Sequence, residues 1–118
     1  MNNSNLVYRI IREADWKEAK LSGKIPASPV DIASGFVHLS PANQVFKTLE
    51  LYFTKEDRPL LLAINSSVLA ADLKWEAVAK RNGALFPHLY RALLLSDIED
   101  HAMLHWQEKE KKWSCSLL

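Results

Sequence analysis

The sequence contains a single cysteine, Cys115, and no long apolar run. One cysteine excludes an internal disulfide and a zinc ribbon. The longest apolar stretches, such as LLLAI at 60–64, are far too short to cross a bilayer. The first residues, MNNSNL, are polar and uncharged, so we expect no secretory signal and a cytoplasmic protein.

An excess of charge of one sign is also missing. Fifteen Lys and Arg stand against fourteen Asp and Glu, which leaves a formal net charge of +1. This balance argues against a broad basic surface that binds nucleic acid or an anionic membrane, so we expect neither as a partner. The sequence shows no internal repeat and no linker. At 118 residues, 48% of them hydrophobic, we expect one domain, 1–118, that folds around its own core.

What the sequence does contain is a series of strand-like segments. Segments rich in β-branched and aromatic residues predict strands at 7–11, 36–40, 60–64, 73–79 and 91–95. Two prolines in IPASPV (25–30) indicate a loop, and Asn82-Gly83 marks a turn. The segment 101–113 could be a helix by propensity or a strand and hairpin by context. We favour the strand and hairpin, because a half-open sheet needs partners there.

Two short helices are expected between these strands. Asp15 begins a capping-box pattern before a first helix at 16–22. Ser40 is a good N-cap and Pro41 suits the first position of a second helix, in which apolar residues recur at helical spacing through 41–53. Together the segments predict a mixed α+β domain with short helices and about five or six strands.

Two histidines stand in short segments with aromatic neighbours. In GFVHLS (35–40), alternation along a strand would turn Val37 toward the core and His38 to the opposite face, close to the strand end. FPHLY (86–90) places His88 in a similar setting. Such positions suit a cleft. The simpler interpretation is a pair of half-buried histidines whose ring nitrogens are satisfied by backbone groups.

Three other features have simple explanations. Glu76 is most simply a solvent-facing carboxylate, although in a cleft desolvation would raise its pKa and make it a base or a partner for a cation. His101 and His105 lie four positions apart without a third ligand nearby, so we expect no metal site. The ending CSLL (115–118) fits a lipidation box, but chance explains it better because glutamates dilute the basic residues before it.

GFVHLS, Trp75-Glu76 and FPHLY together resemble domain-of-unknown-function family 952, a family of small, mostly bacterial proteins. Its members carry Y-x-I, a W-x-x-A helix, GFIHLS followed by Gln, a WE strand and FPHLYG. The matching residues here are Tyr8 and Ile10, Trp16 and Ala19, 35–40 with Gln44, Trp75-Glu76, and 86–90. The resemblance extends to about residue 96. Arg91 replaces the usual glycine, and the sequence after Ile98 has no counterpart.

That family resembles the ADP-ribosyltransferase superfamily in fold, a split, mixed or antiparallel sheet whose two halves grip NAD. The resemblance implies that His38 anchors the ribose next to nicotinamide, with Ser40 as a second contact. It places His88 and Tyr90 on the nicotinamide side and Glu76 near the anomeric carbon. The implied residues are therefore Glu76 and His88 as catalytic, and His38, Ser40, Tyr8 and Tyr90 as NAD-binding. No Rossmann glycine fingerprint occurs, which fits a different way of holding the dinucleotide.

The function that the resemblance implies is ADP-ribosyl transfer from NAD, or hydrolysis of NAD. Breaking the nicotinamide–ribose bond develops an oxocarbenium-like cation that a fixed carboxylate can stabilise. Tyr90 or Trp75 could stack on the pyridinium ring. The alternative is a non-catalytic pocket for a nucleotide or another small ligand. We expect both histidines to share one concave pocket, with the helix after Ser40 directing its N-terminus at it.

Overall fold

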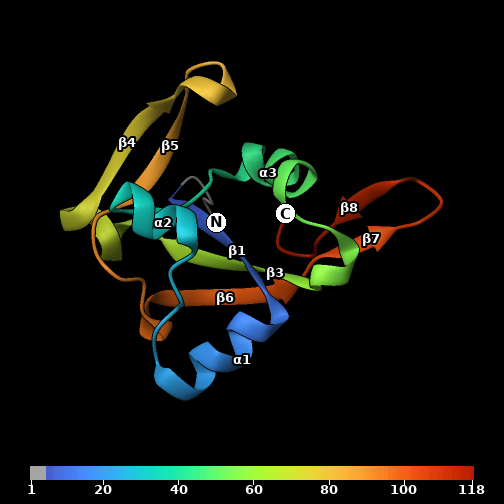
Figure 1. Ribbon diagram of the computed structural model, residues 1–118, viewed down its shortest axis with the longest axis horizontal. Helices are drawn as coiled ribbons and strands as arrows, with labels where there is room; N and C mark the ends of the chain where they lie inside the picture. Colours follow the sequence, from blue (N-terminus) through green and yellow to red (C-terminus); the bar gives the residue numbers. More distant parts are fainter. Residues whose placement is uncertain (1–4) are drawn as a thin grey trace.

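The structure, a computed structural model, describes residues 5–118 (Figure 1). In chain order its elements are β1 (Leu6–Arg12), α1 (Glu13–Ser22), α2 (Pro29–Ser34), β2 (Val37–His38), α3 (Val45–Tyr52), β3 (Pro59–Asn65), β4 (Leu73–Val78), β5 (Ala84–Leu89), β6 (Ile98–Met103), β7 (His105–Gln107) and β8 (Lys112–Ser114). Short helices and antiparallel sheets confirm the expected α+β class. Within these residues no helix is long and apolar enough to cross a membrane.

The strands form three antiparallel sheets, in the orders β1–β3–β6, β2–β5–β4 and β7–β8. In Figure 1 β6 crosses the molecule horizontally, whereas the β4–β5 hairpin rises steeply at the left. The first two sheets meet at one backbone bridge, where Tyr8 N donates to Ser40 O (2.9 Å) and Ser40 N donates to Tyr8 O (2.8 Å). The strands of Tyr8, His38 and Glu76, expected in one split sheet, therefore belong to two bridged sheets.

The core lies on both faces of β3, the central strand of its sheet. Leu60, Leu62 and Ile64 pack in one cluster with residues that include Val7 and Trp16. The alternate residues Leu61 and Ala63 pack in a second cluster with residues that include Tyr8, Leu49 and Trp113. A strand covered on both faces is apolar at every position, as LLLAI is. Full burial of each leucine side chain stabilises the fold by roughly 1.5–3 kcal/mol.

Both predicted helices begin elsewhere than the sequence indicated. α1 begins at Glu13, with Arg12 in the N-cap position and no side-chain cap, so the capping box expected from Asp15 is wrong. After Ser40 the chain forms a 3-10 turn at Ala42–Gln44, and α3 follows without a side-chain cap. Ser40 is not the N-cap, because its backbone is already paired with β1.

Helix α2 was not predicted from the sequence. It begins inside the predicted loop at 25–30. Ser28 Oγ accepts from Asp31 N (3.1 Å), and Asp31 Oδ2 accepts from Ser28 N (2.9 Å), which is a complete capping box. Pro29 occupies the first turn, where its missing N–H costs nothing. Gly35, at φ 82°, ends the helix in the left-handed conformation that glycine adopts most easily. α2 thereby fixes Asp31 next to β2.

The strand expected at 91–95 is wrong. Its place beside β4 is taken by β5, and Asn82 (φ 61°) and Gly83 (φ 77°) make the expected turn between the two strands. FPHLY is therefore mostly strand, and Pro87 lies within it. Between Leu89 and β6 the described chain forms an isolated antiparallel bridge of Leu94 with Lys24 and a 3-10 turn at Leu95–Asp97, but no strand. The strand and hairpin favoured for 101–113 are confirmed by the end of β6 and by β7–β8.

Candidate functional site

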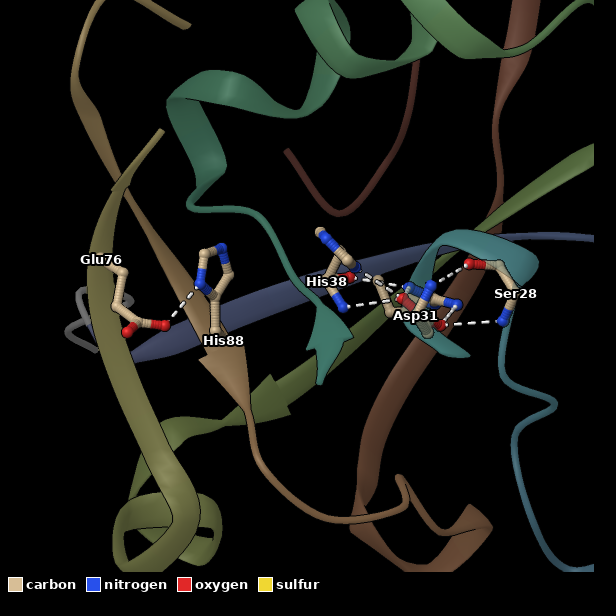
Figure 2. Close-up of polar contacts among 6 residues, drawn as sticks. Ser28, Asp31, His38, Glu76 and His88 are labelled. Atoms are coloured by element: carbon tan, nitrogen blue, oxygen red, sulfur yellow. Dashed lines mark hydrogen bonds and ion pairs between the residues drawn. The ribbon is translucent and has the colours of Figure 1, made fainter. Parts of the chain in front are cut away.

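The two histidines lie directly opposite each other on neighbouring strands. His38 of β2 is paired with His88 of β5 in the antiparallel ladder, so both side chains leave the same face of the sheet. Their ring centroids are 5.6 Å apart. Figure 2 shows each ring with a carboxylate beside it, Asp31 next to His38 and Glu76 next to His88. The fold thus brings together two histidine–carboxylate pairs.

The first pair is built on buried charge. Asp31 Oδ1 lies 2.7 Å from His38 Nδ1 and also accepts from the His38 backbone N–H (3.1 Å). Arg9 Nη2 donates to Asp31 Oδ2 (2.6 Å), and Arg9 Nη1 donates to the His38 carbonyl (2.8 Å). The side chains of Asp31 and Arg9 are 2% and 9% exposed, whereas that of His38 is 36% exposed. A buried ion pair therefore holds a histidine that is partly exposed to solvent.

The ionisation of Asp31 determines which nitrogen of His38 is available. Burial by itself would raise the pKa of Asp31. The hydrogen bond from His38 and the charge and hydrogen bonds of Arg9 outweigh burial and hold this pKa well below its usual range. An ionised carboxylate can only accept, so Nδ1 of His38 carries the hydrogen and donates it to Asp31. In neutral His38 the free nitrogen, Nε2, is then an acceptor.

In the second pair the histidine is buried and the carboxylate is partly exposed. Glu76 Oε1 lies 2.8 Å from His88 Nδ1 and accepts from Tyr90 Oη (2.6 Å). The His88 side chain is 7% exposed and the Glu76 side chain 40%. The hydrogen bond from Tyr90, followed by that from His88, lowers the pKa of Glu76, and the bond to Glu76 raises the pKa of Tyr90. Lys74 Nζ stands 5.1 Å from the centroid of the Tyr90 ring. Glu76 is therefore an ionised carboxylate at neutral pH.

Phe36 packs against both pairs. Its ring is stacked on His88 with centroids 4.0 Å apart, and it lies 4.5 Å from the ring of His38 and 5.3 Å from that of Tyr90. Phe36 was not among the site residues predicted from the sequence. The signal was present, because alternation along β2 puts Phe36 on the same face as His38.

Arg81, at the turn between β4 and β5, is another residue near the site that was not predicted from the sequence. Its guanidinium lies 4.7 Å from the centroid of the Phe86 ring. Phe86 and His88 are two positions apart on β5, so both point to the same face. Arg81 also donates to Gln44 Oε1 (2.7 Å) and to Thr48 Oγ1 (3.0 Å) at the start of α3. A fixed positive charge therefore lies over Phe86, two residues from His88 on the same face, and is bonded to the start of α3.

Ser40 lies two residues after His38, and Tyr8 on β1 is the bridge partner of Ser40. Their backbones are bonded to each other, and both residues are buried. The Tyr8 ring belongs to the core cluster that contains Val45 and Leu49 of α3, and burial raises the pKa of its phenol. Among residues 5–118, none of the hydrogen bonds or ring contacts of the two histidines involves the side chain of Tyr8 or Ser40.

Trp75 lies away from the histidines. Glu76 and Trp75 are neighbours in β4, so their side chains leave opposite faces of the strand. Trp75 is 48% exposed on the face opposite the histidines. Of the two aromatic residues expected to contact the pyridinium ring, the structure brings only Tyr90 to the histidine pairs.

Two surface hollows lie elsewhere, near the β7–β8 hairpin. They have volumes of about 410 Å³ and 370 Å³, and both are lined in part by Glu50 and Trp113. Neither is lined by His38 or His88, so the expected concave pocket around the histidines stays a prediction. No three His, Cys, Asp or Glu side chains of the described chain gather as metal ligands.

Comparison with known proteins identifies the family. The chain belongs to the family described as "Protein of unknown function (DUF952)", whose model matches residues 10–101. The matched range contains Asp31, His38, Glu76 and His88, and it ends before the β7–β8 hairpin. The family resemblance noted from the sequence motifs is thus confirmed. Among curated proteins, none matches this chain.

Two structures of one bacterial protein are similar to this chain over most of its length. The X-ray crystal structure of CC0527 from Caulobacter crescentus is 40% identical, has a TM-score of 0.82, and aligns over 92% of this chain and 93% of that one. The solution NMR structure of CC0527 is 42% identical, has a TM-score of 0.77, and aligns over 89% of each chain. Both support the same α+β fold.

Proposed function

We propose that this member of the DUF952 family binds NAD or ADP-ribose at the two histidine–carboxylate pairs and cleaves the nicotinamide–ribose bond of NAD. The ADP-ribosyl group would pass to an acceptor or to water. The observation that carries the proposal is the orientation of the two imidazoles. Each is anchored through Nδ1 by a carboxylate, and neither Nε2 atom has a hydrogen-bond partner among residues 5–118, so both are available on one face of the sheet.

Ribose recognition follows from this arrangement. A neutral imidazole with a fixed Nδ1–H presents an acceptor at Nε2, which suits a sugar hydroxyl. With ring centroids 5.6 Å apart, Nε2 of His38 can accept from a ribose hydroxyl while Nε2 of His88 faces the neighbouring C1′. Phe36 and Tyr90 offer aromatic surface beside the rings, where the flat nicotinamide could pack. The site therefore matches both halves of a nicotinamide nucleoside.

Cleavage would use the second pair. The C1′–N1 bond breaks, its electron pair leaves with nicotinamide, and positive charge develops on the ribose ring. Ionised Glu76, whose pKa is lowered, stabilises that charge from a fixed position. The oxygen of water or of an acceptor hydroxyl then bonds to C1′ and gives its proton to Nε2 of His88, with Glu76 stabilising the resulting imidazolium.

Arg81 gives the proposal a second, independent contact. NAD and ADP-ribose carry a diphosphate next to the ribose, and a guanidinium is the side chain best suited to bind it. Arg81 lies on the His88 face of β5, and its hydrogen bonds to α3 hold it in place. The start of α3 adds a favourable dipole at the same end of the site.

One observation favours a non-catalytic ligand-binding module instead. Glu76 Oε1 already accepts hydrogen bonds from His88 and Tyr90, so it is as well placed to fix a binding surface as to face a cation. The two functions differ in what happens to the ligand. A binding module would return NAD intact.

Incubation with NAD, followed by chromatography of free nicotinamide, separates the two functions. We expect nicotinamide release that falls by about 100-fold or more in Glu76→Gln, the range for loss of a positioned catalytic group. Glu99→Gln, an exposed glutamate on β6, is the matched control and should retain full activity. NAD that binds but stays intact at every protein concentration would establish the binding module and refute the catalytic proposal.

A further inference from the structure

Strand β4 has a free edge. In its sheet, β2–β5–β4, it is the last strand, and nothing in the described part of the chain pairs with its outer side. In Figure 1 it forms the outer left border of the molecule. An unpaired strand edge is a template for another strand, so it is a candidate interaction surface.

The backbone groups on this edge can be assigned from the hydrogen bonds on the other side of β4. Tyr90 N donates to Asp72 O (2.8 Å) and Gly83 N donates to Val78 O (3.0 Å), so the even-numbered residues turn their backbone groups toward β5. Pro87, opposite Trp75, directs its carbonyl the other way, to Leu39 N (3.1 Å). The odd-numbered residues of β4 therefore direct their N–H and C=O groups outward. They are Leu73, Trp75 and Ala77.

The edges of the other three-stranded sheet are less open to pairing than β4, although β4 also carries two charged residues, Lys74 and Glu76. β6 carries Glu99 and Asp100, and its register with β3 shifts at Ala63/Ile64, which disfavours pairing with a further strand. β1 is bridged by Ser40, two residues after the end of β2. β4 contains no proline and shows no register shift with β5. On its face opposite the histidines, Trp75 is 48% and the neighbouring Leu85 57% exposed.

We propose that β4 pairs with β4 of a second copy of this chain, antiparallel about a two-fold axis at Trp75. In this register Trp75 faces Trp75 of the partner subunit, and Leu73 faces Ala77 of the partner subunit. The backbone N–H and C=O groups of all these residues point outward from β4, so the two residues of each pair exchange both backbone hydrogen bonds. The interface is isologous, as in most symmetric dimers.

The charged residues of β4 favour this register over registers in which the two-fold axis is shifted by one residue. With the axis at Trp75, Lys74 lies opposite Glu76 of the partner subunit, and the same pair recurs on the other side of the axis. These are non-hydrogen-bonded positions, where opposing side chains come closest. Moving the axis by one residue would place Lys74 opposite Lys74, or Glu76 opposite Glu76, in the two subunits. Opposing like charges are destabilising in a ladder.

The apolar face adds contact area without making the interface large. The two Trp75 rings would meet on the face opposite the histidines, and Leu85 would approach Leu73 of the partner subunit across Ala77. Two short strands cover less than the roughly 1,000 Å² typical of stable complexes, so we expect a reversible, concentration-dependent dimer. Because Glu76 also binds His88, Lys74 of the partner subunit would stand beside the histidine site. The dimer does not rest on the proposed function.

Sedimentation equilibrium tests the proposal directly, at concentrations from about 10 µM to about 1 mM, the affinity range of weak complexes. The wild-type protein should shift from monomer to dimer across this range. Lys74→Glu and Glu76→Lys should each weaken self-association by about tenfold or more, because opposing like charges replace both ion pairs. An equimolar mixture of the two variants should dimerise again. In the mixed dimer the Lys74→Glu chain has carboxylates at positions 74 and 76, and the Glu76→Lys chain has ammonium groups at both. Each carboxylate then lies opposite an ammonium group.

A second variant pair tests the backbone without touching charge. Ala77→Pro removes an outward N–H, and an edge strand tolerates proline there, so the variant should fold as a monomer. Ala77→Ser keeps the N–H and should dimerise like the wild-type protein. Circular dichroism confirms folding of each variant. A monomer at every concentration would overturn the proposal, and so would a dimer that Ala77→Pro leaves intact or a mixture of charge variants that stays monomeric.

Discussion

The two histidine–carboxylate pairs use the same hydrogen bond with opposite burial. In the first pair the carboxylate of Asp31 is 2% exposed and His38 is 36% exposed. In the second pair His88 is 7% exposed and Glu76 is 40% exposed. The buried member of the first pair is an ion that Arg9 must balance, whereas the buried member of the second is a ring that can be neutral. The first pair should therefore matter more for folding, and the second can respond to a ligand.

Asp31→Asn should produce the largest change in stability. It leaves the buried Arg9 guanidinium without its counter-ion, and breaking a buried pair in this way costs about 3–5 kcal/mol of unfolding free energy. Asp57→Asn is the matched control, because Asp57 pairs with the half-exposed Arg12 and should cost about 1 kcal/mol or less. Urea unfolding measures both. Equal losses in the two variants would contradict the assignment of Asp31 as the charge that anchors the site.

The stabilisation from Asp31 should disappear in acid. A carboxyl whose pKa is lower in the folded than in the unfolded state stabilises fully above its unfolded pKa of about 4 and loses this contribution as pH falls toward the folded value. The difference in unfolding free energy between wild type and Asp31→Asn should therefore persist from pH 7 to pH 5 and shrink below about pH 4. A difference that already shrinks between pH 7 and pH 5 would implicate another group.

Glu76→Gln should have a much smaller effect on stability. The Glu76 side chain is 40% exposed, and glutamine can still accept from Tyr90, so the thermal midpoint of the variant should stay close to that of the wild type. Differential scanning calorimetry of Glu76→Gln beside Asp31→Asn measures the contrast. A midpoint for Glu76→Gln as low as that for Asp31→Asn would show that both pairs are structural, and would remove the basis for distinguishing them.

Tyr90→Phe should give the smallest effect and the most specific one. It removes the hydrogen bond that contributes most to lowering the pKa of Glu76, so that pKa should rise toward its ordinary value. The carboxyl carbon of Glu76, followed by NMR during a pH titration, reports this directly. Tyr52→Phe, an exposed tyrosine on α3, is the control and should leave the Glu76 titration unchanged.

The sequence predicted the meeting of the histidines better than it predicted what holds them. Alternation placed His38 on one face of a strand. The family motifs predicted that His88 and Glu76 belong to the same site. Asp31 was missed because two prolines indicated a loop, although Ser28 followed three residues later by Asp31 is a helix-start pattern. Arg9 gave no local signal, because the direction of a guanidinium inside an apolar strand is set by tertiary contacts.

The predicted strand boundaries are wrong where they were based on proline or on an apolar run alone, without the long-range contacts of the segment. Pro87 indicated a turn, but β5 tolerates it because its carbonyl still accepts from Leu39 beyond the end of β2. The residues 91–95 have strand propensity, yet β4 already has its partner in β5. The expected cap at Ser40 failed for the same kind of reason, since pairing with Tyr8 takes its backbone. In each case a long-range pairing overrode a local preference.

Isothermal titration calorimetry of NAD and ADP-ribose against the wild-type protein, His38→Ala and His105→Ala tests the central claim most directly. His105 is exposed on β7, away from the site, and serves as the matched control. We predict saturable binding to the wild type and to His105→Ala, and binding weaker by about tenfold in His38→Ala, the loss expected when one hydrogen-bond partner of the ligand is removed. Absence of binding to the wild type, or equal binding to all three proteins, would contradict the claim that the paired histidines form a nucleotide site.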